Sequence, residues 1–156
     1  MQHLHILAVG ALSESWLREG CAHYQKRIAR YFKLTVTELD EYRLPGSPSP
    51  AQIEQALERE AQALRGKLPA RSISVALCPR GKALDTPGLA GLLERGGNGV
   101  AFIIGSSHGM SETLRESADL RVSLSPLTFP HQLARLVLLE QIYRCGNIQG
   151  GGKYHK

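Results

Sequence analysis

The sequence predicts an α/β fold in which a mainly parallel sheet is flanked by helices. Segments rich in β-branched and apolar residues alternate with segments whose apolar residues recur every three or four positions, five times along the chain. Strands and helices that alternate in this order are typical of parallel sheets with right-handed crossovers. The run 100–104 (VAFII) is apolar throughout, as expected of a strand covered on both faces.

The composition favours one globular domain. A chain of 156 residues is long enough for one core, so we predict a single domain over residues 1–156. Hydrophobic residues make up 42% and charged residues 21%, which excludes the disordered and collagen-like classes. The formal net charge of +5 permits a polyanionic partner without requiring one.

The same sequence indicates a soluble protein of the cytoplasm. No run of apolar residues approaches the ~20 that a membrane span needs, and no basic residue precedes the first apolar run, as it would in a signal peptide. Cys21, Cys78 and Cys145 are far apart and form no C-x-x-C pair. We therefore expect reduced thiols, with neither a disulfide framework nor a zinc site.

The first strand and helix are expected before residue 32. Alternating apolar residues from Leu4 to Ala8 predict a strand that Gly10 ends. Ser13 is the expected N-cap of a helix, because apolar residues then recur at helical spacing as far as Tyr31.

A second strand and helix follow. Residues 33–39 (KLTVTEL) alternate and are rich in β-branched side chains, and the proline-rich segment 43–50 predicts a loop. Ser49 and Gln52 have the spacing of a capping box around Pro50, so they predict a helix, and we expect Gly66 to end it.

The second half repeats the pattern three times. We expect a strand over 73–78, a turn over 79–82, and a short helix that opens at Thr86-Pro87 and ends at Gly96-Gly97. A buried strand over 100–104, a short helix over 111–117 and a strand over 121–124 follow. The last helix is expected from His131 to about Cys145, and a glycine-rich tail follows it.

Three loops are the expected place for a ligand, because parallel sheets bind ligands at the carboxyl ends of their strands. They are CPRGK at 78–82, GSSHG at 105–109 and SPLTFP at 125–130. None contains the G-x-G-x-x-G fingerprint, and the chain has no P-loop, G-x-S-x-G or H-E-x-x-H motif. Triphosphate hydrolysis, acyl transfer and metalloprotease chemistry therefore lack their motifs.

Two of these loops have two interpretations each. The glycines of 105–109 let the backbone approach a ligand, or they simply form a tight turn. Segment 125–130 has two prolines and no charge, which suits a neutral aromatic ring such as adenine. The same segment also suits a rigid linker into the last helix, and the residues alone leave both alternatives open.

Basic residues gather in two places. His23, Lys26, Arg27, Arg30 and Lys33 share helical spacing with no acid among them, which fits either an RNA-binding face or a solvated helix surface. The second cluster comprises Arg135, Arg144, Lys153 and Lys156 with His131 and His155. Glu140 is expected to pair with Arg144 at i+4. Either histidine is a candidate proton shuttle, and a structural role for His131 is an equal alternative.

The C-terminal third carries a specific resemblance. The segments FIIGSSHGMS, SLSPLTFPHQLARLVLLEQIYR and the terminal YHK resemble the bacterial rRNA large-subunit methyltransferase H family, and the resemblance extends over nearly the whole chain. That family belongs to the SPOUT superfamily, whose members bind S-adenosylmethionine in a C-terminal trefoil knot and act as homodimers. Ser106, His108 and residues 78–80 depart from the family's usual residues.

The resemblance implies a reaction and its residues. The family methylates N3 of a pseudouridine in 23S rRNA on the assembled 70S ribosome, without a metal. The implied cofactor-binding residues are Leu77, Gly105, Leu124, Ser125, Pro126, Leu127, Thr128 and Phe129. Since the imide N–H must lose a proton, a base or an oxyanion stabiliser is needed.

We expect the catalytic groups near the C-terminus. Arg144 is the predicted stabiliser of charge on a ring oxygen, and Tyr154 and His155 are the tail residues expected to contact the base and accept a proton. The predicted substrate-binding residues are Lys26, Arg27, Arg30, His131, Lys153 and Lys156. The alternatives are a SPOUT methyltransferase that acts on tRNA and a noncatalytic ribosome- or RNA-binding factor of the same fold.

Overall fold

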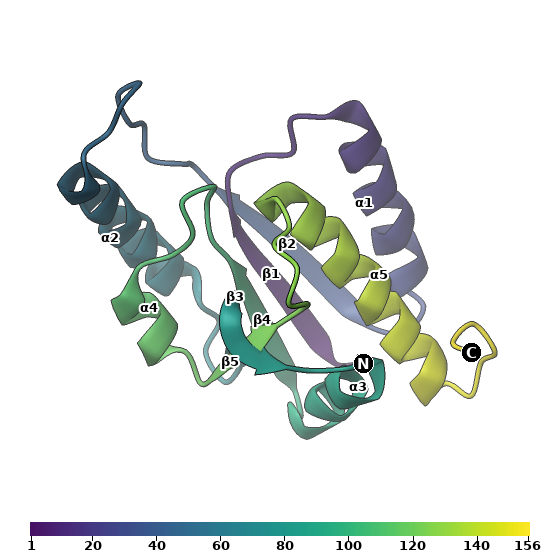
Figure 1. Ribbon diagram of the computed structural model, residues 1–156. Coiled ribbons are helices and arrows are strands. Elements are labelled where there is room, and N and C mark those ends of the chain that lie inside the picture. Colours follow the sequence, from purple (N-terminus) through teal and green to yellow (C-terminus); the bar gives the residue numbers. More distant parts are fainter.

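Five parallel strands form one sheet at the centre of the molecule (Figure 1). The computed structural model describes residues 1–156. The strands are β1 (His3–Val9), β2 (Lys33–Leu39), β3 (Ile73–Ala83), β4 (Gly99–Ile104) and β5 (Leu120–Ser123), in the spatial order β2-β1-β4-β3-β5. Every neighbouring pair is parallel, which confirms the predicted α/β sheet.

Helices cover both faces of this sheet. They are α1 (Ser15–Ile28), α2 (Pro50–Lys67), α3 (Thr86–Arg95), α4 (Glu112–Ser117) and α5 (His131–Gln149). Figure 1 shows α1, α3 and α5 on one side of the sheet and α2 and α4 on the other. The structure therefore has three layers, and the carboxyl ends of all five strands point toward the same edge of the sheet.

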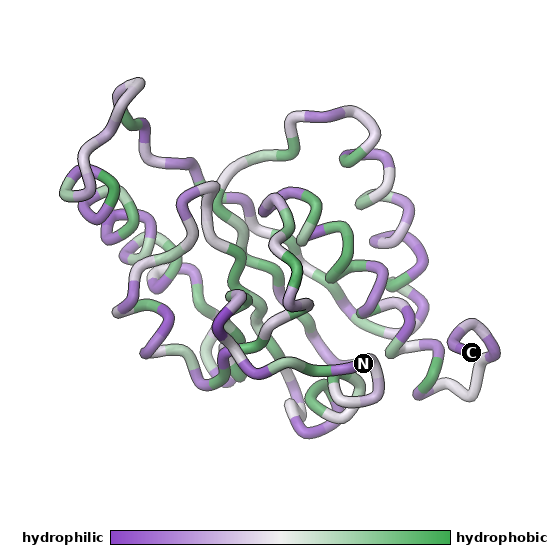
Figure 2. Tube along the Cα trace, viewed as in Figure 1, coloured by the Kyte–Doolittle hydropathy of each residue, from purple (hydrophilic) through white to green (hydrophobic).

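The core has two parts because β1 and β4 are buried on both faces. Ile6 and Phe102 belong to the larger cluster, under α1, α3 and α5, whereas their neighbours Leu7 and Ile103 belong to the smaller cluster under α2 and α4. Figure 2 shows the hydrophobic residues concentrated along the central strands. The wholly apolar run at 100–104 is thus explained, as predicted, by helices on both sides.

The capping box of α2 is confirmed. The Ser49 hydroxyl accepts from the Gln52 N–H at 3.1 Å, and the Gln52 side chain accepts from the Ser49 N–H at 2.8 Å. The helix ends at Lys67, one residue beyond the predicted stop at Gly66. The predicted cap of α1 is wrong, because Glu14 is the N-cap and the hydroxyl and N–H of Ser13 instead donate to Gln132 of α5.

The predicted turn at 79–82 is also wrong, because those residues continue β3. Leu77 and Lys82 both lie opposite Val122 of β5, so the intervening residues form an irregular bulge within the strand. A Cβ at Gly81 would lie 2.6 Å from the Val122 nitrogen, so the backbones approach as closely as glycine alone permits. The bulge places the end of β3 beside β5.

The last helix is longer than predicted. It continues past Cys145 to Gln149, and Gly146 packs against Tyr31 instead of ending the helix. A Cβ at Gly146 would lie 2.7 Å from the ring of Tyr31, which follows α1. Residues 150–156 therefore form a short tail that lies against the end of α5 (Figure 1).

Helix α1 ends at Ile28, before Tyr31, to which the apolar spacing predicted it to continue. The remaining predictions agree with the structure within one residue at their starts and ends. The strands over 100–104 and 121–124 and the helices at 86 and 111–117 are present as β4, β5, α3 and α4. All three cysteines are free thiols, as predicted. No helix combines the length and the apolar character that a membrane crossing requires. The trefoil knot implied by the family resemblance stays a prediction.

Candidate functional site

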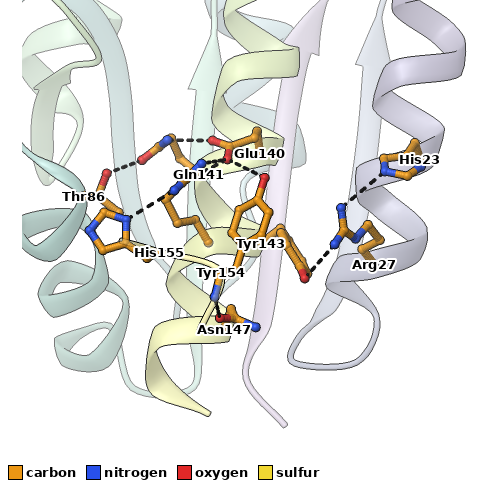
Figure 3. A network of polar contacts seen from close by, with 10 residues as sticks. His23, Arg27, Thr86, Glu140, Gln141, Tyr143, Asn147, Tyr154 and His155 are labelled. Atoms are coloured by element: carbon orange, nitrogen blue, oxygen red, sulfur yellow. Dashed lines mark hydrogen bonds and ion pairs between the residues drawn. The ribbon is translucent and has the colours of Figure 1, made fainter. Parts of the chain in front are cut away.

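A polar cluster joins the end of α5 to the C-terminal tail (Figure 3). Arg144 donates to Oε1 of Glu140 through Nη2 at 2.5 Å and Nε at 2.9 Å, which confirms the expected i+4 pair. The hydroxyl of Tyr154 donates to the same oxygen at 3.1 Å. One carboxylate oxygen thus gathers two of the three residues that were predicted to be catalytic.

The other oxygen of Glu140 is held as well. The Gln141 side-chain amide donates to Oε2 at 2.6 Å, and its own oxygen accepts from the hydroxyl of Thr86 at 2.6 Å. Thr86 begins α3, so this chain of bonds ties the cluster to a second helix. Because both oxygens are engaged, the carboxylate holds Arg144 in one orientation.

His155 completes the cluster. Its Nδ1 lies 3.3 Å from Nη1 of Arg144. An arginine N–H can only donate, so Nδ1 is the acceptor of this contact and the ring N–H is on Nε2. The Glu140 hydrogen bond raises the pKa of Arg144, which therefore stays a cation at every physiological pH.

Tyr154 is held as a protonated donor. Its ring lies 4.6 Å from the guanidinium carbon of Arg144. Burial, with the neighbouring Tyr24 and Glu140, raises the pKa of its hydroxyl to about 12. At neutral pH, Tyr154 therefore offers a proton for hydrogen bonding and does not form a phenolate.

The basic face of α1 meets this cluster through Tyr143. Arg27 donates to the Tyr143 hydroxyl at 2.9 Å, and its guanidinium carbon lies 4.2 Å from the Tyr143 ring and 5.5 Å from that of Tyr154. The rings of Tyr143 and Tyr154 are in edge contact, with centroids 4.9 Å apart. A surface cavity of about 510 Å³ is lined by His23, Lys26, Arg27, Arg30 and Tyr143. The structure thus brings one predicted substrate-binding residue, Arg27, beside the ring of the predicted catalytic Tyr154, and places Lys26 and Arg30 around the same cavity.

The other basic residues are divided. Lys153 and Lys156 are exposed on the tail, next to the cluster in sequence. Arg135, placed in the second basic cluster from the sequence, is 3% exposed and donates to Glu38 at 2.5 Å and to the Gly10 carbonyl at 2.9 Å. It is therefore a structural residue and not part of a basic surface. Glu38 is 97 residues away along the chain, and no local signal connects the two.

His131 lies at the opposite end of α5 from Arg144. It is beside Gly10, because a Cβ built on Gly10 would lie 3.7 Å from its Nε2 and 3.8 Å from Glu41. Burial, and then the charge of Arg135, lower the pKa of His131, although Glu41 opposes this effect. The imidazole is therefore neutral at neutral pH.

The turn at Gly105–Gly109 closes on itself. Ser106 and Gly109 exchange backbone hydrogen bonds of 2.9 and 2.8 Å, and a Cβ at Gly105 would lie 2.2 Å from the Gly109 oxygen. Gly109 also has φ +90°. The tight-turn interpretation is thus sufficient to explain both glycines, and a ligand contact at Gly105 stays a prediction.

Segment 124–129 has features that fit a planar ligand. Its two hydrogen bonds pass through Ser125, whose carbonyl accepts from Ser123 and whose hydroxyl accepts from the Leu127 N–H. The remaining backbone N–H and C=O groups of 126–129 have no partner within the chain. Leu127 is 72% exposed, and Leu77 and Leu124 are half-buried against the larger core cluster. Free backbone groups beside apolar side chains match the needs of an adenine ring.

The structure does not bring the Gly105 turn and the Arg144 cluster together within one chain. The ends of β1 and β4 are paired at Ala8 and Ile104, so the Gly105 turn lies near Gly10 and His131. Arg144 is thirteen residues farther along α5 than His131, which is ~20 Å at 1.5 Å per residue. The two groups of predicted site residues therefore lie toward opposite ends of α5.

Comparison with known proteins identifies the family. A family model described as "Predicted SPOUT methyltransferase" matches residues 2–155. The chain belongs to the SPOUT methyltransferase family. This assignment confirms the superfamily that the segments at 102–111, 123–144 and 154–156 implied.

Curated relatives of this SPOUT methyltransferase share its full length. A protein from Moorella thermoacetica is 43% identical over 160 residues, covering 100% of both chains. One from Pelotomaculum thermopropionicum is 42% identical over 159 residues, covering 99% of both, and one from Streptococcus equi subsp. zooepidemicus is 39% identical, covering 98% of this chain and 99% of its own. All three are named "Ribosomal RNA large subunit methyltransferase H".

A solved structure supports the fold. The probable methylase family protein from Haemophilus influenzae Rd KW20 superposes with a TM-score of 0.56, covering 98% of this chain and 70% of that one. The two sequences are 12% identical, so the similarity extends to the fold alone.

Sequence reasoning missed residues that shape the cluster at the end of α5. The missed residues are Tyr143, Asn147 and Tyr31, which surround the tail and were not predicted as site residues. Tyr143 lies next to Arg144 and shares one face of α5 with Asn147 at i+4, so helical spacing was the available signal.

Proposed function

We propose that this chain methylates large-subunit ribosomal RNA with S-adenosylmethionine as the methyl donor. The observation that carries the proposal is the full-length identity of 42–43% with two proteins named "Ribosomal RNA large subunit methyltransferase H". The acceptor is N3 of a pseudouridine in 23S rRNA of the assembled ribosome, as the family resemblance implies. The chain therefore works in the cytoplasm, where ribosomes are found.

The donor is held at the carboxyl edge of the sheet. Leu77, Gly105 and residues 124–129 form its site, and the unpaired backbone groups of 126–129 bond the edge of its adenine ring. When bound, S-adenosylmethionine supplies an electrophilic methyl group on a sulfonium. His131 lies at the same end of α5 and contacts the acceptor nucleotide.

Arg144, Tyr154 and His155 promote loss of the imide proton. A permanent guanidinium beside a ring oxygen of the acceptor stabilises the negative charge that develops when N3 loses its proton. The Nε2–H of His155 adds a second donor to the same charge. The hydroxyl proton of Tyr154 is held by Glu140, so Tyr154 contributes by packing its ring against Arg144 and fixing the guanidinium in place. These residues stabilise the N3 anion while the N3 proton passes to solvent. The donor would supply the methyl group by cleavage of its methyl–sulfur bond and would leave as a neutral thioether.

Neither Tyr154 nor His155 fits the predicted role of proton acceptor. The pKa of Tyr154 is about 12, so its hydroxyl keeps its proton. The free nitrogen of His155 already accepts from Arg144. Electrostatic stabilisation of the acceptor therefore accounts for the cluster better than a general base does.

The active unit of the proposal is a homodimer. The donor loops and the Arg144 cluster lie toward opposite ends of α5, so the tail of one subunit serves the donor site of its partner. Basic residues near the tail contact the phosphates of the ribosomal RNA. They are Lys26, Arg27 and Arg30 on α1 and Lys153 and Lys156 on the tail itself.

Methyl transfer to ribosomes tests the proposal. Labelled S-adenosylmethionine is supplied with 70S ribosomes, isolated subunits, free rRNA or tRNA from a strain that lacks this protein, and the product is mapped by nuclease digestion. We expect label on a pseudouridine N3 in ribosomes, and loss of that label with Arg144→Ala. Label on tRNA instead of ribosomes would show that the acceptor is a tRNA. Donor binding without transfer to any RNA would favour a noncatalytic ribosome-binding factor.

A further inference from the structure

Asn147 holds the C-terminal tail at two points and Tyr31, just after α1, at a third. Its side-chain oxygen accepts from the Tyr154 backbone N–H at 2.9 Å, and its backbone oxygen accepts from the Gly152 N–H at 2.8 Å. Its side-chain amide donates to the hydroxyl of Tyr31 at 3.1 Å. Figure 3 shows the Asn147 side chain directly beneath the start of Tyr154. One residue of α5 thus links the tail to the end of α1.

The backbone of the tail at Gly152 lies so close to the Asn147 side chain that only glycine fits there. A Cβ at Gly152 would lie 2.3 Å from both terminal atoms of the Asn147 side chain, so no side chain fits between them. Tyr31, the other partner of Asn147, is in turn packed against Gly146. The positions of Asn147 and of the tail are therefore fixed by contact as well as by hydrogen bonds.

We propose that Asn147 is the positioning residue of the tail, which places Tyr154 and His155 against Arg144. Three consecutive glycines at 150–152 give the tail large conformational freedom unless something fixes it. The bond to the Tyr154 N–H lies directly before the two reactive side chains. This inference rests on the proposed function, and it adds a residue that acts through the tail without touching the acceptor.

The test measures tail order and catalysis separately. Backbone amide exchange at Tyr154, followed by NMR, reports the hydrogen bond to Asn147 without any substrate. Asn147→Ala removes the acceptor, so we expect exchange at Tyr154 to become about tenfold faster and kcat of methyl transfer to fall about tenfold, the effect of one ordinary hydrogen bond. KM for S-adenosylmethionine should stay unchanged, because the donor loops lie at the other end of α5.

Three further variants give the test its controls. Asn147→Asp keeps an oxygen facing the Tyr154 N–H and should restore both slow exchange and most of kcat. Gly152→Ala leaves Asn147 in place but forces the tail away, so it should reproduce the loss. Gln149→Ala removes another side-chain amide at the same helix end, one that bonds Ala90 of α3 at 3.3 Å, and should change neither quantity.

The inference fails if Tyr154 exchanges equally fast in the wild type and in Asn147→Ala, or if kcat is unchanged while exchange accelerates. A parallel loss of melting temperature and donor affinity would show a general structural role and would also overturn it. If the wild type transfers no methyl group, the proposed function fails, and amide exchange in the four variants still decides whether Asn147 fixes the tail.

Discussion

At the scale of single residues, buried charge is the main departure from an ordinary core. Arg135 is balanced by Glu38 and the Gly10 carbonyl, although its Nε has no partner. Glu60 of α2 is 6% exposed and accepts from the Tyr42 N–H at 2.9 Å through one oxygen, and its other oxygen has no partner. The Arg135 side chain ties α5 to the sheet, and the Glu60 carboxylate fixes the loop after β2.

Glu60 should make the folding stability depend on pH. Burial raises the pKa of its carboxyl above the unfolded value, so the folded state binds the proton more tightly. Its contribution to stability is therefore greatest at low pH and falls as the pH rises through the folded pKa. Glu60→Gln, which keeps an oxygen for Tyr42, should raise the melting temperature at pH 7 and have a smaller effect at pH 4.

Thermal unfolding at both pH values checks this prediction. Glu54→Gln on the same helix is the matched control, because Glu54 is exposed and should leave the pH dependence unchanged. A Glu60→Gln variant that is no more stable at pH 7 than the wild type would contradict the argument.

At the scale of helices and strands, features that depend on neighbouring residues were predictable from the sequence. Features that depend on close contact between distant segments were not. The capping box of α2 depends on residues three positions apart, and the sequence shows it directly. The bulge in β3 depends on Val122, and the continuation of α5 through Gly146 depends on Tyr31, both distant along the chain. A glycine that permits packing has the same appearance in sequence as one that ends a helix.

Loss of the α2 cap should have a measurable cost. Ser49→Ala removes the acceptor for the Gln52 N–H and should lower the free energy of unfolding by about 1 kcal/mol. Urea denaturation measures the difference. Ser47→Ala, in the exposed loop just before the helix, should be neutral, and equal effects of the two substitutions would show that the cap contributes nothing.

At the scale of the whole molecule, the site depends on parts that are far apart. Residue chemistry and position near the C-terminus predicted Arg144, Tyr154 and His155 as a group, and the structure places them in contact. The sequence could not predict that Arg27 would approach Tyr154 through Tyr143, because Arg27 and Tyr143 are 116 positions apart. Nor could periodicity show that the donor loops and the tail lie toward opposite ends of one helix.

Removal of the tail should separate donor binding from catalysis. A chain that ends at Gly152 lacks Tyr154 and His155 but keeps Leu77, Gly105 and residues 124–129. We expect S-adenosylmethionine to bind with unchanged affinity in calorimetry while single-turnover methyl transfer to ribosomes is lost. Methyl transfer at the wild-type rate would show that the tail takes no part in catalysis.

Helix α5 therefore also sets the distance between His131 and the Arg144 cluster. Its nineteen residues span ~28 Å, with His131 in the first turn and Arg144 near the other end. Substitutions on its surface leave this separation intact, whereas one inserted residue would lengthen it and rotate the Arg144 cluster by about 100° relative to His131. We infer that evolution can vary the composition of this helix far more freely than its length.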